Sequence, residues 1–204
     1  MVVASAADLI VLWAGLELAA AAAVVMVSLR RPDLALRLLV AGGLASGLLL
    51  IGLAFLYAST GNSDLSVIRA VLFGAAPTVT LAIPLLLLVS GLAVRASLAP
   101  FQLAGLPAGL GASPIGAGLL LGLVAAAAAT VAIKLATALV PVPALISPYL
   151  EVLAAVAMVG GGAAALAVRS PRARMAYLAT GQMGWVAAGL MTHYRTGIAA
   201  SLFM

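Results

Sequence analysis

The chain has 204 residues, of which 66% are hydrophobic and only 7% are charged, and its mean hydropathy is +1.30. A soluble domain carries about 25% charged residues, so this composition excludes a soluble globular protein and indicates an integral membrane protein. The net charge of +5 does not point to a nucleic-acid partner, because the basic residues gather at the ends of apolar segments, where they orient a chain in a bilayer. With no cysteine and one histidine, His193, the sequence offers no ligand set for a metal or haem, so we expect no cofactor and no catalytic residue.

Six full membrane spans and a truncated seventh are predicted, which makes the expected fold an all-α polytopic membrane protein. Proline and glycine residues mark the joints between the apolar runs. The expected spans cover residues 9–29, 34–57, 79–98, 115–140, 150–168 and 175–192, and the seventh begins at residue 197. No soluble domain fits between them, so residues 1–204 are expected to form a single transmembrane domain. The pairs Gly43/Gly47 and Gly118/Gly122 favour close packing between helices.

The placement of arginines predicts the orientation of the chain. If the spans alternate, two arginine groups fall on one side of the membrane and only two single arginines fall opposite. The positive-inside rule then puts the groups in the cytoplasm and the N-terminus outside, in the cell inner (plasma) membrane. The groups are Arg30 with Arg31, and Arg169 with Arg172 and Arg174; the single residues are Arg69 and Arg195.

Glu17 is a lone carboxylate near the middle of the first apolar run. It lies about 12 Å from one end of that run and about 18 Å from the other. A charge at this depth costs a few kcal/mol on insertion scales, so such a residue usually has a partner and a task. Desolvation favours the protonated carboxyl and a nearby cation favours the carboxylate, so a partner that moves would make a proton switch. The alternative interpretation is a static buried ion pair or an acid that faces a cavity.

Three basic residues inside other spans are the candidate partners of Glu17: Arg37, Arg95 and Lys134. Arg95 is the obvious mate, although its position near the end of its expected span is equally typical of an arginine that reaches the headgroups. Arginine does not deprotonate in proteins, so Arg95 could bias Glu17 without relaying a proton. For Arg37, a few residues into its span, reaching the headgroups is favoured. Lys134 is chemically able to relay a proton, with an interfacial position as the alternative.

Four sequence patches together suggest a family. They are Trp13-Ala-Gly-Leu-Glu17, Gly42-Gly-Leu-Ala-Ser-Gly47, Arg95-Ala-Ser-Leu-Ala-Pro-Phe101 and Gly181-Gln-Met-Gly-Trp185. In this order and spacing the chain resembles the antiporter-like proton-channel subunits of respiratory complex I, of the NADH–quinone oxidoreductase subunit N type. Related chains occur in membrane hydrogenases and multisubunit cation/proton antiporters.

The resemblance implies that Glu17 matches the glutamate of the family's fifth helix. Arg95 then matches the lysine that pairs with that glutamate, and Arg37 matches a basic position of the sixth helix. It implies a proton half-channel built on Glu17 and Arg95, with Arg37 and Lys134 as further members of the proton path. It also implies partners, namely other membrane and peripheral subunits of a respiratory complex that carry the redox chemistry. The lipid bilayer surrounds the chain, and no nucleic acid is expected.

The sequence departs from the family pattern where protons should pass. The relay lysine of the family's eighth helix falls on Ala125, Lys134 falls on a later basic position, and the histidine after Pro-Phe falls on Gln102. The resemblance covers only the middle of a family member, so a fragment, a split gene product or a reduced paralogue is expected. A structural or degenerate subunit without conduction, and a cation/proton antiporter or membrane hydrogenase module, stay open beside the first interpretation. The transported ion and the electron donor are also open.

Overall fold

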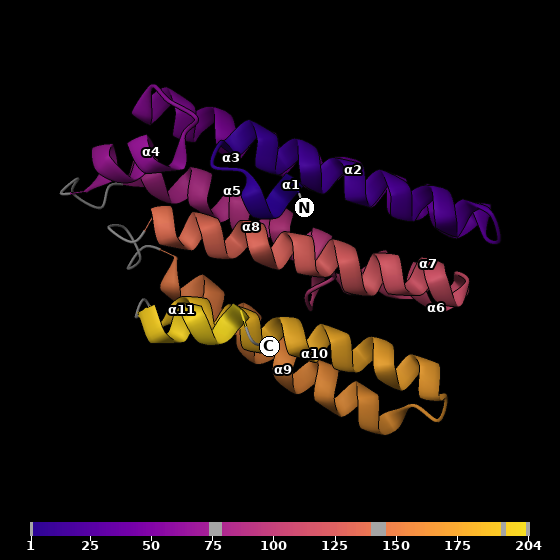
Figure 1. Cartoon of the computed structure of the whole chain (residues 1–204). Helices are drawn as coiled ribbons and strands as arrows, with labels where there is room; N and C mark the ends of the chain where they lie inside the picture. Colours follow the sequence, from indigo (N-terminus) through magenta and orange to yellow (C-terminus); the bar gives the residue numbers. More distant parts are fainter. Residues whose placement is uncertain (1, 74–78, 140–145, 193–194, 203–204) are drawn as a thin grey trace.

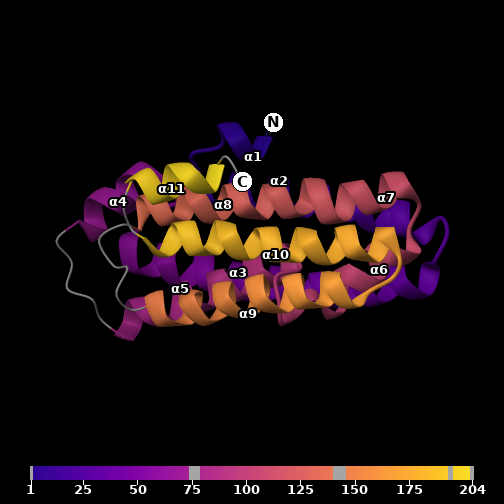
Figure 2. The same cartoon turned by 90° about the horizontal axis from the view of Figure 1, so that it is seen from below.

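The computed structural model describes residues 2–73, 79–139, 146–192 and 195–202, and these form an elongated helical bundle (Figures 1 and 2). Its long helices run side by side along one axis. They are α2 (Leu9–Ser28), α3 (Pro32–Thr60), α5 (Val79–Arg95), α8 (Ala125–Ala138), α9 (Ser147–Ala167) and α10 (Pro171–Met191). The short elements are α1 (Val2–Ser5), α4 (Leu65–Leu72), η1 (Phe101–Leu103), α6 (Gly105–Gly111), α7 (Pro114–Gly118), η2 (Leu119–Val124) and α11 (Arg195–Leu202).

Four of the described helices are long and apolar enough to cross a membrane: α2, α3, the continuous run Pro114–Ala138 made of α7, η2 and α8, and α9. The apolar part of α5, Leu81–Arg95, is shorter. The all-α membrane class is therefore confirmed, and the count of six spans and a seventh stays a prediction. Many outward-facing side chains are large and apolar, as Leu166 and Val159 show, which suits a surface in contact with lipid.

Local sequence explains where the helices begin and end. The Asp8 carboxylate accepts hydrogen bonds from the backbone N–H groups of Ile10 (2.8 Å) and Val11 (3.3 Å), which is the preferred chemistry for starting a helix such as α2. The helices α3, α9 and α10 each carry a proline in the first turn, where its missing N–H costs nothing. At the end of α3, Gly61 adopts a left-handed conformation with φ of 70°, which stops the helix.

A break separates α5, which fills most of the third expected span, from the short helix α6 that follows it. The chain leaves α5 at Arg95, turns through Ser97 and η1, and becomes helical again at Gly105. In both views α5 and α6 occupy successive parts of the bundle length (Figures 1 and 2). The span predicted to end at residue 98 ends at Arg95, and the predicted joint after it contains the helix α6, which the sequence did not predict. The glycines and proline of α6 disfavour a helix by propensity, but Leu106 and Ala108 are buried, so packing overrides propensity.

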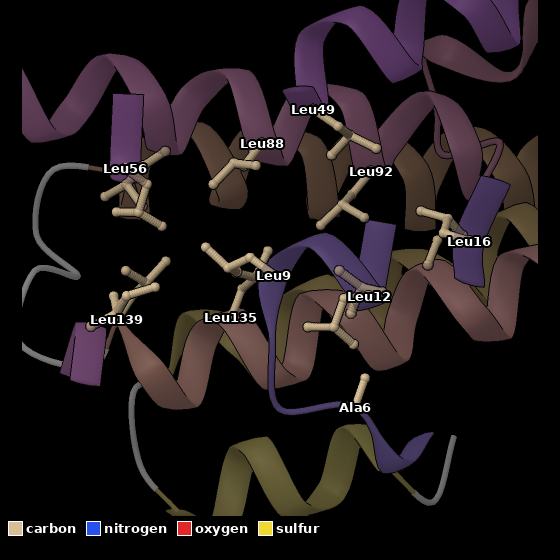
Figure 3. Packing of buried hydrophobic residues seen from close by; sticks show 14 of the residues in the cluster. Ala6, Leu9, Leu12, Leu16, Leu49, Leu56, Leu88, Leu92, Leu135 and Leu139 are labelled. Atoms are coloured by element: carbon tan, nitrogen blue, oxygen red, sulfur yellow. The ribbon is translucent and has the colours of Figure 1, made fainter. Parts of the chain in front are cut away.

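The main core lies between α2, α3, α5 and α8 (Figure 3). Leu9, Leu12 and Leu16 of α2 lie on one helical face and meet leucines of α5 and α8, such as Leu92 and Leu135. Lipid is as apolar as these side chains, so tight packing rather than escape from water holds membrane helices together. This packing fixes the direction of the residue that follows Leu16, which is Glu17.

Close helix approach depends on glycines other than the predicted pairs. A Cβ atom on Gly52 of α3 would lie 2.8 Å from Leu88 Cγ of α5, and one on Gly161 of α9 would lie 2.7 Å from the backbone nitrogen of Gly181 in α10. The predicted pairs were wrong, because they face open space with no atom within 4 Å: Gly43, Gly47, Gly118 and Gly122. A small-residue spacing shows that a close contact is sterically allowed, and it does not show which face meets a neighbour.

Candidate functional site: a buried ion pair at a helix break

Glu17 and Arg95 are in direct contact inside the bundle. Arg95 Nη2 donates a hydrogen bond to Glu17 Oε1, and the two charges form an ion pair between α2 and the last residue of α5. The Arg95 side chain is 7% exposed and that of Glu17 is 29% exposed. An arginine buried in this way does not reach the headgroups, so the alternative interpretation of Arg95 is wrong. Within the described residues the other ion pair, Arg31 with Asp33, is exposed and joins near neighbours in the sequence.

The break explains why Arg95 lies deep in the bundle. The last residue of α5, Arg95, is 8% exposed, and α6 lies further along the bundle, so the C-terminal end of α5 lies in the interior of the bundle (Figure 1). The carbonyl groups at a helix C-terminus carry partial negative charge and favour a cation in the last turn. The guanidinium therefore has one anionic neighbour, the Glu17 carboxylate, and belongs to the last turn of its helix, where the dipole favours a cation.

A small cavity lies beside the ion pair. It has a volume of about 20 Å³, which is enough for roughly one water molecule, and Arg95, Ser97, Gly42 and Gly105 are among the residues that line it. In the described part of the chain, the Nε of Arg95 is buried without a hydrogen-bond partner, and so is Oε1 of Gln102 in η1. Buried polar atoms nearly always have a partner, and water is the usual one where protein atoms do not supply it. The break thus combines unpaired polar atoms with room for water.

Two further polar contacts hold the helices that carry the pair. Trp13 Nε1, one turn before Glu17, donates to Ser46 Oγ at 3.2 Å and joins α2 to α3. In α5 the Ser90 hydroxyl lies 2.9 Å from the Tyr149 hydroxyl of α9. Hydrogen bonds between membrane helices are each worth about 1 kcal/mol. They fix α2 and α5 on either side of the charged contact.

Arg37 does not join the pair. Its side chain is exposed, five residues before Gly42, the position where α3 approaches the guanidinium of Arg95. Five residues correspond to a rotation of about 140° around a helix, so Arg37 leaves α3 in a different direction. This location agrees with an arginine that reaches the membrane surface.

Lys134 lies near the beginning of α2 rather than near Glu17. Its Nζ donates to the backbone carbonyls of Ala4 (2.7 Å) and Ala6 (2.5 Å), which ties α8 to the segment before α2. Glu17 is more than two helical turns further along α2, about 12 Å from its start. Ala125 is buried at 3% exposure at the start of α8 and has no titratable group. The structure therefore brings together two of the four predicted path residues.

A larger cavity of about 110 Å³ lies between α5, α8 and the α9–α10 pair. Of the described residues only apolar side chains line it, among them Leu92, Ala132 and Val186. None of these described lining residues carries a charge or a hydroxyl group, so their side chains supply no group that takes up or passes a proton.

Comparisons with known proteins agree with this geometry. The model of the family described as "NADH:quinone oxidoreductase/Mrp antiporter, TM" matches residues 6–204. The chain belongs to this family. The NADH-quinone oxidoreductase subunit N of Granulibacter bethesdensis is 33% identical over 209 residues, which cover 97% of this chain and 43% of the relative. The chain therefore spans less than half of the length of this curated relative.

Solved structures of the family share the fold. A chain of respiratory complex I from Thermus thermophilus with bound Aureothin matches with a TM-score of 0.77 and 26% identity, over 98% of this chain and 46% of that one. A chain of the Mrp complex from Dietzia sp. matches with a TM-score of 0.86 and 23% identity, over 97% of this chain and 22% of that one. At 23% identity, the match to the Mrp complex is evidence for a shared fold only.

Arg172 has a structural role in this family member that the sequence analysis missed. Its Nη2 donates to the carbonyl oxygens of Gly109 (3.0 Å) and Ala112, the last carbonyls of α6. Arg174 does the same for α9, because its Nε donates to the carbonyl oxygen of Ala165 at 3.2 Å. In the sequence analysis both residues serve to predict the orientation of the chain. The one feature of the sequence that points to this role is the position of Arg172 directly after the helix start Ser170-Pro171. That position does not show which helix end the arginine contacts. His193 lies outside the described residues.

Proposed function

We propose that this part of the chain forms a proton half-channel of a proton-translocating NADH–quinone oxidoreductase of the complex I type. One observation carries the proposal: a buried guanidinium at the break of α5 and α6 contacts the only carboxylate placed mid-way along an apolar helix. Family membership supports this assignment over an unrelated buried ion pair. In this proposal Arg37 and Lys134 lie at the outer ends of the path, and Glu17 with Arg95 forms its centre.

The chemistry divides between the two residues. Glu17 takes up and releases the proton, whereas Arg95 keeps its charge, because a guanidinium does not deprotonate in proteins. When the pair is closed, the arginine stabilises the carboxylate as an anion. When the arginine moves away, the carboxyl group is free to bind a proton. The small cavity beside Arg95 supports delivery of that proton by water.

The proposal includes the arrangement in the membrane. The passes are α2, α3, α5 with α6, the run of α7, η2 and α8, α9 and α10, with α11 as the beginning of a seventh pass, all in a single transmembrane domain. The N-terminus lies outside, and both arginine groups lie at the cytoplasmic end of an inner (plasma) membrane protein. Other membrane subunits and peripheral subunits of the complex are the partners, and they hold the redox cofactors.

Proton flux in vesicles tests the proposal. The chain, with the membrane subunits that co-purify with it, is reconstituted and the flux driven by a pH gradient is measured. Glu17→Gln should abolish the flux that this chain supports, because glutamine has the shape of glutamate but does not carry the proton. Glu151→Gln is the matched control, since Glu151 is exposed at the start of α9 and bonds only to Ser147 (2.9 Å) among the described contacts. Flux that is unchanged in Glu17→Gln would refute the proposal.

A structural subunit without conduction is the second candidate. The Nζ of Lys134 is held by two backbone carbonyls and Ala125 lacks a titratable group, so no described residue of α8 is free to continue a path. In that case the pair only fixes α2 against α5, and all variants conduct alike. If flux instead depends on sodium or potassium, the chain serves as a cation/proton antiporter module.

A further inference from the structure

Gly42 is the position where α3 comes against the guanidinium of Arg95. A Cβ atom on Gly42 would lie 3.1 Å from Arg95 Nη1, 3.7 Å from Cζ and 4.0 Å from Nη2. These are the three nearest heavy atoms, and all of them belong to one side chain. The distance to Nη1 is tighter than nine in ten contacts of real Cβ atoms, so the guanidinium would have to give way.

We propose that Gly42 is a positioning residue, whose missing side chain lets the guanidinium lie close against α3 while its Nη2 contacts Glu17. The guanidinium is planar and rigid, so Nη1 and Nη2 move together. A methyl group that displaces Nη1 therefore also displaces Nη2, which makes the bond to Glu17. Because Arg95 is buried and only a one-water cavity adjoins it, the displaced group has little room in which to restore the contact.

Helix propensity predicts the opposite result for the same substitution. Gly42 lies in the interior of α3, where alanine is more favourable than glycine because it loses less backbone freedom on folding. Without the contact to Arg95, Gly42→Ala should therefore stabilise the protein. The adjacent Gly43 provides a matched control, since it lies in the same helix and a Cβ there meets nothing within 4 Å.

Replacing Arg95 with lysine gives a second test of the contact with Gly42. A lysine ammonium ends near the place of the Arg95 Cζ and has no second nitrogen branch. The 3.7 Å between the Gly42 Cβ position and Cζ is an ordinary van der Waals distance, so lysine fits beside alanine. Gly42→Ala should then damage the protein that contains Arg95 and be tolerated in the Arg95→Lys background. The glycine would thus select a guanidinium as the partner of Glu17.

Thermal unfolding in detergent tests the proposal on five proteins: the parent, Gly42→Ala, Gly43→Ala, Arg95→Lys and the double variant Gly42→Ala with Arg95→Lys. We expect Gly42→Ala to lower the melting temperature by several degrees and Gly43→Ala to raise it slightly. The double variant should melt no lower than Arg95→Lys. The proposal is wrong if Gly42→Ala stabilises the protein as Gly43→Ala does, or if it is equally damaging in the Arg95→Lys background.

Proton flux separates this inference from the proposed function on which its biological role rests. We expect Gly42→Ala to reduce the flux several-fold, and the double variant to match Arg95→Lys. If the melting temperatures follow the expected pattern while Glu17→Gln leaves flux unchanged, the positioning role of Gly42 stands and the proton half-channel is refuted. If Glu17→Gln abolishes flux and the melting temperatures of Gly42→Ala and Gly43→Ala agree, the half-channel stands and the role of Gly42 is refuted.

Discussion

Replacing Glu17 and replacing Arg95 should lower the free energy of unfolding by different amounts. Removing one member of a buried pair costs about 3–5 kcal/mol, because the other charge stays buried without compensation. Glu17→Gln leaves Arg95, which is 7% exposed and cannot lose its charge, although the amide oxygen still accepts its hydrogen bond. We expect a cost of about 3 kcal/mol. Arg95→Met leaves Glu17, which is 29% exposed and can take up a proton, so we expect a cost of about 1–2 kcal/mol.

The assay is thermal unfolding in detergent, followed by tryptophan fluorescence; of the two tryptophans, Trp13 lies one turn before Glu17. For a chain of this length 1 kcal/mol corresponds to about 2–4 °C, so Glu17→Gln should lower the melting temperature by about 6–12 °C and Arg95→Met by about 2–8 °C. The double variant should lose less than the sum, because neither charge is then left alone. A larger loss in Arg95→Met, or additive losses, would show that burial does not determine the energetics of this contact.

Three further predictions concern contacts outside the pair. Arg172→Gln should cost about 1–2 kcal/mol and speed amide hydrogen exchange in α6 but not in α9, because it removes the cation that caps the end of α6. Gly161→Ala should cost about 1–3 kcal/mol through overpacking of α9 on α10, whereas Gly160→Ala, which meets nothing within 4 Å, should not lower the melting temperature. The Ser63 hydroxyl, by its hydrogen bond, holds the pKa of the Asp8 carboxyl below its usual value of 3.8. Since this pKa is lower in the folded state, the stabilisation is complete above the unfolded value and is lost as the pH falls through the folded one. The melting-temperature deficit of Ser63→Ala should therefore be constant near neutral pH and disappear in acid, below the usual value of 3.8; a deficit that persists there would contradict it.

Composition and periodicity were sufficient to predict the membrane class and the long apolar helices. The depth of Glu17 in its apolar run also indicated correctly that a cation from another helix reaches it. These inferences succeed because the bilayer imposes helix length and penalises an unpaired charge. The constraint is independent of tertiary detail, so a single sequence reveals it.

The break between α5 and α6 could not be predicted in the same way. A segment with the sequence Gly-Leu-Pro-Ala-Gly-Leu-Gly has the composition of a loop, and it becomes the helix α6 only because neighbouring helices bury Leu106 and Ala108 and Arg172 caps its end. The position of Arg95 then changes from the end of a span to the interior of the bundle. The same limitation explains the wrong glycine pairs, since the face that a helix turns to its neighbours is decided by packing of the whole bundle.

An arginine at the break restricts how the pair can take part in transport. A lysine partner could lose its own proton and so release Glu17 without moving, whereas a guanidinium keeps its charge and must be displaced. Of the charged side chains in the described residues, Arg95 alone is buried. If this chain conducts protons, the uptake of a proton by Glu17 must therefore be coupled to movement of the end of α5. Because only a one-water cavity adjoins the guanidinium and α3 packs against it at Gly42, that movement has to shift the helix end and not the side chain alone.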